Sequence, residues 1–365
     1  MTNQTALKTT KEPFARVVKK AEISGKKVAL LRIMAFILAI VAGGVFILLI
    51  GENPFAVYGT IISGAFRSAM AFQGTVKIMI PLLITSLGVT LAFKMKFWNI
   101  GAEGQIIMGA IFASYFALFH DTLNHGLLIF IMFVAGIIGG GLWGLIPAFF
   151  KSKFDTNETL FTLMLNYIAL HIVSYLRDGP WMDPGSQGYS KIATFSKNAM
   201  LDRVFGVHIG WIVAIILTVA VFIYIKYTKQ GYEISVVGES HETARYAGMN
   251  VKLITLRTMF LSGAICGIAG MIQATGSDKT LTTAVAGGVG FTAIIVAWLA
   301  KLNPIMIFVI SFLFSILEKG SSVLQSSYGL STDCADVLQG IILFFVLGCE
   351  LFVRYKFVFR KKGGA

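Results

Sequence analysis

Charged residues are scarce in this sequence. Only 13% of its 365 residues are Asp, Glu, Lys or Arg, whereas 56% are hydrophobic. A soluble domain carries about a quarter charged residues, and the mean hydropathy here is +0.77. The composition therefore excludes an ordinary soluble domain and predicts a chain that crosses a membrane several times.

Cysteine is also rare, and this excludes two kinds of framework. The three cysteines, Cys266, Cys334 and Cys349, have no C-x-x-C spacing, and their number is odd. Neither a disulfide scaffold nor a zinc site fits such a set. We interpret all three as small apolar residues.

The motifs of common enzyme classes are missing as well. The chain has no G-x-x-x-x-G-K-[ST] segment, so it does not itself bind ATP through a P-loop, and it has no H-E-x-x-H metal motif. It also has no nucleophile elbow. His120 and His125 share one predicted loop, where solvated histidines explain them better than a metal does. We expect a protein that is not an enzyme and has no metal or cofactor.

Long apolar segments are what the sequence has instead. They predict an all-α membrane protein with about 10 transmembrane helices. Counts of eight or nine stay open, because the short segments 284–300 and 303–318 can each be a half-helix. Residues 55–73 predict a short interfacial or re-entrant helix, and residues 319–335 a Ser-rich loop. The predicted spans are about 29–50, 74–93, 102–119, 126–149, 158–176, 209–227, 253–274, 284–300, 303–318 and 336–353.

Charge placement predicts the orientation. Basic residues outnumber acidic residues by 31 to 18, and with an even number of spans almost all of this excess lies on the face that carries both termini. Positive loops stay in the cytoplasm. We therefore expect cytoplasmic N- and C-termini, a basic arm at 1–28, a transmembrane domain at 29–353 and a basic tail at 354–365. The charge orients the protein and does not recruit nucleic acid, and Leu30–Ile50 is expected to be a retained span.

One polar stretch interrupts the apolar chain at Asn99-Ile100-Gly101-Ala102-Glu103-Gly104-Gln105. A carboxylate at membrane depth costs about 2.5–3.5 kcal/mol on insertion scales, so Glu103 is either shallow or functional. One interpretation is a helix start, with Asn99 as N-cap and Glu103 in the first turn. The other is a broken helix facing a cavity, where transporters place their sites. The two are compatible, because a cap can also line a pore.

Glycines recur along one predicted helix. Gly139–Gly144 matches G-x-G-x-x-G, but it lies inside a predicted span with no preceding strand, which argues against a dinucleotide site. The spacing of Gly136, Gly140 and Gly144 instead predicts a smooth helix face for close packing. Gly263 and Gly267 repeat this pattern in a later span.

Polar residues mark two further segments. Asp155 or Thr156 is expected to cap the helix that follows, with Glu158 closing a capping box. Within that helix, Asn166 and Tyr167 can bond either a polar substrate or a neighbouring helix.

Residues 232–250 form the longest polar interruption on the predicted cytoplasmic face. Ser240 can cap a short helix at 241–247, and Gly248 fits the position just after its end. Such a helix is either a docking element for a partner or a plain amphipathic linker.

Taken together, these segments resemble the integral-membrane permease of bacterial ABC importers, in the branch that handles nucleosides and is related to simple-sugar and branched-chain amino-acid permeases. The resemblance covers about residues 30–355. Four strings carry it: Phe97 to Gln105, Thr156 to Ala169, Val237 to Met249, and Gly290-Phe291-Thr292-Ala293 with Leu302-Asn303-Pro304. One departure is His241-Glu242-Thr243, where many relatives have Asn-Pro-Glu, and it affects only docking detail.

The resemblance implies the partners and the roles of several residues. It implies a second related permease, a cytoplasmic ABC ATPase that hydrolyses ATP, and an extracytoplasmic substrate-binding lipoprotein, all at a bacterial cell membrane. The segment 232–250 would be the coupling loop that contacts the ATPase, through Gly238, Glu239, Ala244, Arg245, Ala247 and Gly248. The candidate pathway residues are Asn99, Glu103, Gln105, Asn166 and Tyr167.

Three alternatives stay open. A simple-sugar or branched-chain amino-acid permease lies within the same class. An ion-coupled secondary transporter would need paired intramembrane acids, but the acids here lie mostly near predicted span ends. A membrane enzyme would need an acid, histidine or metal cluster that the sequence does not offer.

Overall fold

The structure is a computed structural model that describes residues 15–19, 25–186, 188–329, 331 and 333–359. Its contacts divide the chain into two compact units, residues 58–335 and residues 1–57 with 336–365. Each unit is described by itself below.

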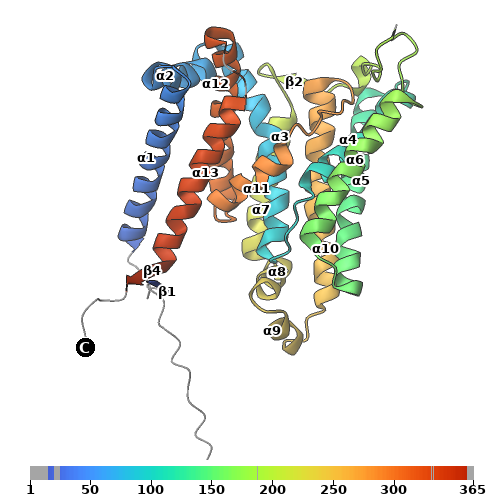
Figure 1. The fold of residues 1–365 in the computed structure, drawn as a ribbon. Coiled ribbons are helices and arrows are strands. Elements are labelled where there is room, and N and C mark those ends of the chain that lie inside the picture. Colours follow the sequence, from blue (N-terminus) through green and yellow to red (C-terminus); the bar gives the residue numbers. More distant parts are fainter. Residues whose placement is uncertain (1–14, 20–24, 187, 330, 332, 360–365) are drawn as a thin grey trace, which may run out of the picture. The chain divides into compact units, whose positions relative to one another are not determined.

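The larger unit is a helical bundle (Figure 1). A short β-hairpin, β2 (Arg203–Val204) with β3 (Val207–His208), lies before α7. The helices are α2 (Pro54–Phe66, which begins in the other unit), α3 (Ala69–Lys94), α4 (Ala102–Phe119), α5 (His125–Phe154), α6 (Glu158–Asp178), the 3-10 turn η1 (Lys197–Ala199), α7 (Gly210–Tyr227), α8 (Lys229–Glu239), α9 (His241–Tyr246), α10 (Val251–Ile272) with its π-helical extension η2 (Gln273–Asp278), α11 (Val289–Leu299) and α12 (Pro304–Tyr328).

The smaller unit joins the two ends of the chain. It contains α1 (Gly25–Leu49) and most of α13 (Asp333–Arg354). Strand β1 (Ala15–Lys19) pairs antiparallel with β4 (Tyr355–Phe359). Part of the predicted N-terminal arm is thus paired with the C-terminal tail, and α1 begins earlier than the predicted residue 29.

Seven described helices are long and apolar enough to cross a membrane, or eight if the bent pair Ile33–Leu49 and Pro54–Phe66 counts as one more. This confirms a mostly helical protein that spans the membrane several times. Of the two interpretations of 284–300, a full span and a half-helix, the structure shows the shorter one: α11 has 11 residues, about half of what a bilayer requires. The span count of about ten and the side of the termini stay predictions.

The predicted Ser-rich loop at 319–335 is wrong over most of its length, because α12 continues to Tyr328. The serine hydroxyls do not break this helix, since they bond its own carbonyls. Ser322 Oγ donates to the Lys319 carbonyl over 2.7 Å, and Ser326 Oγ donates to the Val323 carbonyl over 2.9 Å. Such local bonds satisfy a hydroxyl inside a helix.

The start of α6 also differs from the prediction. Its N-cap is Asn157, whose side chain accepts the Leu160 N–H over 3.1 Å. Asp155 instead ends α5 in the left-handed conformation, with φ 50°. Glu158 does not close a capping box, because its carboxylate pairs with Lys151 at 3.1 Å. The Glu158 carboxylate is thus bonded to a lysine in the last turn of α5 instead of closing the cap.

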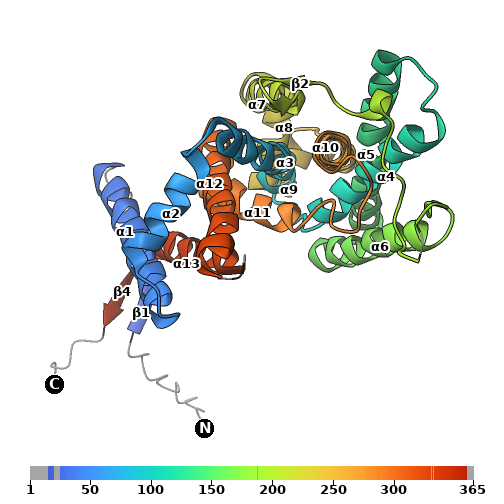
Figure 2. The same ribbon diagram turned by 90° about the horizontal axis from the view of Figure 1, so that it is seen from above.

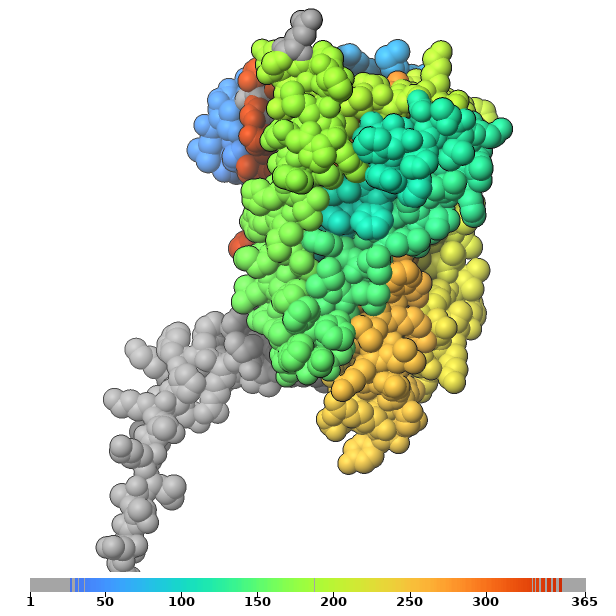
Figure 3. Space-filling model, turned by 90° about the vertical axis from the view of Figure 1, so that its right-hand side faces the viewer, coloured from blue at the N-terminus to red at the C-terminus, as the bar shows by residue number. Residues whose placement is uncertain are grey.

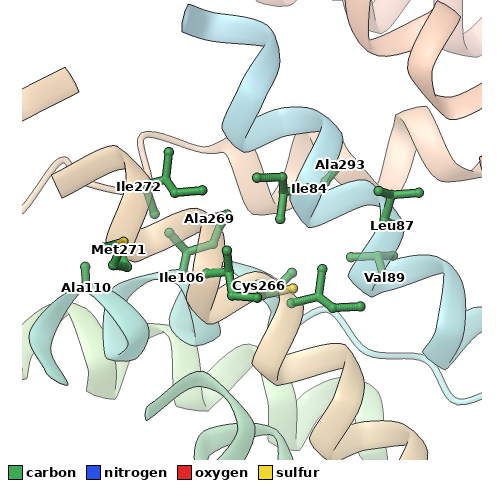
Figure 4. Close-up of a cluster of buried hydrophobic side chains, with 14 of the residues drawn as sticks. Ile84, Leu87, Val89, Ile106, Ala110, Cys266, Ala269, Met271, Ile272 and Ala293 are labelled. Atoms are coloured by element: carbon green, nitrogen blue, oxygen red, sulfur yellow. The ribbon is translucent and has the colours of Figure 1, made fainter. Parts of the chain in front are cut away.

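Helix α10 lies at the centre of the larger unit, with α3, α4 and α5 around it (Figure 2). Their facing side chains form a continuous apolar core, part of which is drawn in Figure 4. Ile84 and Leu87 of α3 and Ile106 of α4 are almost completely buried there, as is Cys266 of α10. Burial of this kind agrees with the interpretation of Cys266 as a small apolar residue.

Glycines set how closely α10 approaches its neighbours, as their spacing predicts. A Cβ added to Gly140 of α5 would lie 2.6 Å from the Gly267 Cα and would also meet the Gly263 carbonyl. A Cβ on Gly144 would lie 2.6 Å from the Met259 carbonyl oxygen. The neighbour atoms are backbone, which cannot move aside. Any side chain on this seam would force the helices apart.

Gly140→Ala is therefore expected to destabilise the protein by about 1–3 kcal/mol, the usual cost of overpacking a core. The measurement is thermal unfolding of the purified protein in detergent. Gly59→Ala is the control, since a Cβ on Gly59 in α2 meets nothing within 4 Å. Equal unfolding temperatures for Gly140→Ala and the parent protein would contradict the close packing of α5 on α10.

Candidate functional site

The polar stretch before α4 is a turn closed by its own side chains. Asn99 is completely buried, and its Oδ1 accepts the Gly101 N–H over 2.9 Å. Its Nδ2 donates to Gln105 Oε1 over 3.3 Å. The prediction that Asn99 caps the helix is wrong: the N-cap is Gly101, which has no side-chain cap bond. The Asn99 amide bonds within the turn instead, so the chain enters α4 two residues later.

Helix α6 supplies the partners that the turn lacks. Asn166 Oδ1 accepts the Gly104 N–H over 2.8 Å, and its Nδ2 donates to the Ile100 carbonyl over 2.9 Å. One turn earlier, Thr162 Oγ1 accepts the Ile100 N–H over 3.1 Å. One face of α6 is thus bonded to the backbone of the turn. Of the two sequence interpretations of Asn166, the structure shows the bond to a neighbouring segment.

Glu103 lies in the first turn of α4, as predicted, but it reaches across to α11. Its two carboxylate oxygens accept the N–H groups of Gly288, over 2.8 Å, and of Gly290, over 2.7 Å. Gly288 has φ +82°, and a Cβ on Gly290 would meet the Glu103 backbone. The carboxylate therefore caps the start of α11, where unpaired N–H groups and the helix dipole favour a negative charge.

The structure thus brings four of the five candidate pathway residues into one hydrogen-bonded cluster that joins α4, α6 and α11. We call it the polar junction; its side chains are Asn99, Glu103, Gln105, Thr162 and Asn166. Each of these side chains bonds another part of the chain. The pathway role of its members stays a prediction, while their structural role is visible.

The fifth candidate, Tyr167, lies on a different face of α6 and is 54% exposed. His171 and Tyr175 follow on the same face, at helical spacings of four, and both are exposed. In the part of the chain that the structure describes, none of these three side chains has a hydrogen-bond partner. We call them the α6 stripe. Sequence reasoning selected only Tyr167; the recurrence of ring side chains every four residues was the signal for the other two.

The exposed face of α5 offers a comparison within the same bundle. From Leu127 to Leu142 its exposed side chains are all apolar: Leu127, Phe130, Val134, Ile138 and Leu142; Phe149, Lys153 and Phe154 follow at its end. Such a face suits lipid, whereas ionisable and polar side chains inside a membrane face a bundle interior or water. The α6 stripe therefore has the chemistry of a wet or partnered surface, and the α5 face has that of a lipid contact.

The polar interruption at 232–250 contains the predicted short helix, α9, and most of a second helix, α8, that was not predicted. Ser240 caps α9, since its Oγ accepts the Thr243 N–H over 3.2 Å, and Gly248 follows its end with φ +75°. Both features were predicted. Tyr246 on α9 is 93% exposed. Of the six candidate coupling residues, Gly238 and Ala244 are buried, while Glu239, Arg245, Ala247 and Gly248 are exposed.

The α8–α9 segment is fixed to the transmembrane core at two points. A Cβ on Gly238 would meet the Lys94 carbonyl and lie 3.3 Å from the Met95 Cα, at the end of α3. Glu233 of α8 pairs with Arg257 of α10 at 2.9 Å. Helix α8 thus contacts both α3 and α10. The end of α3 leads within a few residues to the polar junction.

Comparison with known proteins identifies the family. The model described as branched-chain amino acid transport system / permease component matches residues 70–347 of this chain. The chain belongs to this family. It is an ABC-type permease and a multi-pass protein of the plasma membrane, as the resemblance and the long apolar helices predicted.

Its relatives cover nearly the whole chain. The glucose ABC transporter permease protein TsgB13 of Haloferax volcanii is 30% identical over 89% of this chain and 88% of its own length. The guanosine ABC transporter permease protein NupP of Bacillus subtilis is 28% identical over 92% of this chain and 97% of its own. The nucleoside ABC transporter permease protein NupB of Lactococcus lactis is 29% identical over 87% and 90%, respectively.

The bonds from Glu103 to the start of α11 predict that its carboxylate stabilises the folded protein. In Glu103→Gln, one acceptor oxygen becomes an NH2 group that faces a backbone N–H. The start of α11 then loses a hydrogen bond to a charged group, and two donors face each other. We expect a loss of about 1–3 kcal/mol, measured as thermal unfolding in detergent. Asp121→Asn, at an exposed loop position, makes the matched change without this loss. If the two variants unfold alike, Glu103 does not cap α11.

Proposed function

We propose that this permease moves nucleosides inward across the bacterial cell membrane, driven by ATP that a partner chain hydrolyses. Two of the relatives named above are guanosine and nucleoside permeases, and each matches more than four-fifths of this chain. The simple-sugar alternative is supported by the glucose permease relative at 30% identity. A nucleoside carries both a ribose and a planar base, so the pathway must offer hydrogen bonds and ring faces.

The single observation that carries this proposal is the α6 stripe. Tyr167, His171 and Tyr175 present three exposed rings with unused hydrogen-bonding atoms along about 12 Å of helix. Aromatic side chains stack on any base with about 1–3 kcal/mol per base. These rings lie on a different face of α6 from the polar junction. The polar atoms of the junction already have hydrogen-bond partners within the protein. We therefore take the stripe, including the predicted pathway residue Tyr167, as part of the substrate pathway.

Packing supports a substrate pathway at the exposed face of α6 rather than a tight contact with another helix. Where helices of this bundle touch closely, glycines form the contact, as at Gly140 and Gly267. The exposed face of α6 has only large side chains at its centre, and membrane helix interfaces favour small ones. A wide, water-filled space beside α6 agrees with both observations. A second related permease would bound that space from the other side.

Coupling to the ATPase is assigned to α8 and α9. The exposed side of α9 offers Arg245 and Tyr246 to a cytoplasmic partner, while Ala244 anchors the helix from its buried side. ATP binding would move this helix, and the contacts of Gly238 with α3 and of Glu233 with α10 would pass the motion into the bundle. An extracytoplasmic binding lipoprotein would deliver the substrate at the opposite face.

The substrate assignment is tested by uptake of radiolabelled guanosine into cells that express this chain with its gene neighbours. Tyr167→Leu is expected to raise the concentration for half-maximal uptake at least about fivefold, from the loss of one stacking contact. Phe130→Leu is the matched control, since Phe130 is an exposed ring on the apolar face of α5. Uptake that glucose, and not unlabelled nucleosides, competes away would favour the sugar alternative.

The coupling assignment is tested separately. Tyr246→Ala should lower both the ATPase recovered with the purified permease and the ATP-driven uptake by about tenfold, as expected for truncating an exposed aromatic anchor of an interface. Tyr189→Ala serves as control, because Tyr189 is 83% exposed in the loop between α6 and α7. Full ATPase recovery with Tyr246→Ala would remove α9 from the docking surface. Uptake without any ATPase would support an ion-coupled transporter.

A further inference from the structure

A groove lies beside α9 where the membrane-spanning helices end. Its cavity volume is about 790 Å³. One wall is the end of α5, residues 151–155; the other is formed by His241 and Arg245 of α9 with residues 249–252 at the start of α10. In Figure 3 the green end of α5 and the orange start of α10 lie next to each other in the lower part of the molecule.

Most charges around this groove are already paired. Lys151 lies 2.8 Å from Asp155 and 3.1 Å from Glu158, and Arg245 lies 3.4 Å from Glu242. The Lys151 ammonium lowers the pKa of the Asp155 carboxyl below its usual range, so this carboxylate stays ionised and paired. Among the described residues that line the groove, Asp155 is the one carboxylate, and its charge is thus compensated.

Two lysines remain, one on each wall. Among the residues that the structure describes, Lys153 and Lys252 have no carboxylate within ion-pair distance. Both line the groove. Both lysines therefore line the same cavity without a carboxylate partner, and an anion there would be attracted by both.

The surroundings place the groove at the level of lipid headgroups. Lys153 Nζ lies 5.5 Å from the ring centre of Phe149 and 5.3 Å from that of Phe154. Both rings are exposed, and they continue the apolar face of α5. Exposed aromatic rings with a lysine over them are typical of a membrane–water interface.

We infer that this groove binds the phosphodiester headgroup of an anionic phospholipid, with Lys153 and Lys252 on its two sides. Basic pockets between transmembrane helices on the cytoplasmic side attract such headgroups. The inference rests on the proposed function in one respect, because it takes the face of α8 and α9 as cytoplasmic. A lipid here would join the end of α5 to the coupling helix α9, so its presence would stiffen the segment that the ATPase moves.

The test is native mass spectrometry of the transporter complex, purified with its partner subunits and titrated with phosphatidylglycerol or phosphatidylcholine. Lys153→Gln and Lys252→Gln are each expected to weaken phosphatidylglycerol binding about fivefold, the effect of one lysine near a membrane surface. Phosphatidylcholine binding should not change. Lys197→Gln, at an exposed lysine of η1, is the matched control.

Four outcomes would overturn the proposal. Equal binding of both lipids, or no effect of either lysine substitution, would remove the headgroup site. Full competition by millimolar inorganic phosphate would assign the groove to small anions. Loss of the ATPase subunit from both lysine variants, with lipid binding unchanged, would make the groove part of the ATPase contact. Lipid binding is measured without substrate. A failure of the nucleoside assignment and a failure of the lipid proposal can therefore be told apart.

Discussion

Backbone that leaves a helix inside a membrane must find its hydrogen-bond partners within the protein. Two such places meet in this permease: the turn before α4 and the start of α11. The turn receives Asn166 and Thr162 from α6, and α11 receives the Glu103 carboxylate from α4. The side chains of the polar junction thus satisfy irregular backbone that local backbone bonds leave unpaired. Three elements far apart in the sequence depend on it for their relative placement.

The rest of the bundle is organised by shape. Helix α10 lies at the centre because its glycines and those of α5 and α4 allow backbone to approach backbone. Dispersion and close packing, rather than exclusion of water, stabilise helix contacts in lipid. A bundle of this kind tolerates little added volume at its centre. Helix α8 contacts two helices of this bundle, α3 and α10.

The outer faces of the helices differ in ways that follow their surroundings. From Leu127 to Leu142 the exposed side chains of α5 are all apolar. The exposed side of α6 carries two tyrosines and a histidine beside the apolar residues Leu160, Met164 and Ile168. At the end of α5, Lys153 lies over the rings of Phe149 and Phe154. These contrasts support one proposed division of roles, with α6 toward the substrate, α5 toward lipid and α9 toward the ATPase. The lysines of the proposed headgroup site belong to the excess of basic residues from which the orientation of the chain is predicted.

The sequence by itself determined the class of protein, most helix positions, the glycine seam and the capped helix α9, because these depend on local composition and spacing. It also indicated that Glu103 had to be shallow or functional. Only the tertiary structure decided that Glu103 caps α11, that Asn166 bonds the turn at 100–104, and that Asp155 pairs with Lys151 instead of capping α6. The partners in each case come from another helix or another turn, and a polar side chain in a sequence does not reveal which distant N–H lacks an acceptor. The separation of Tyr167 from the other four pathway candidates has the same cause, since burial depends on which helices surround α6.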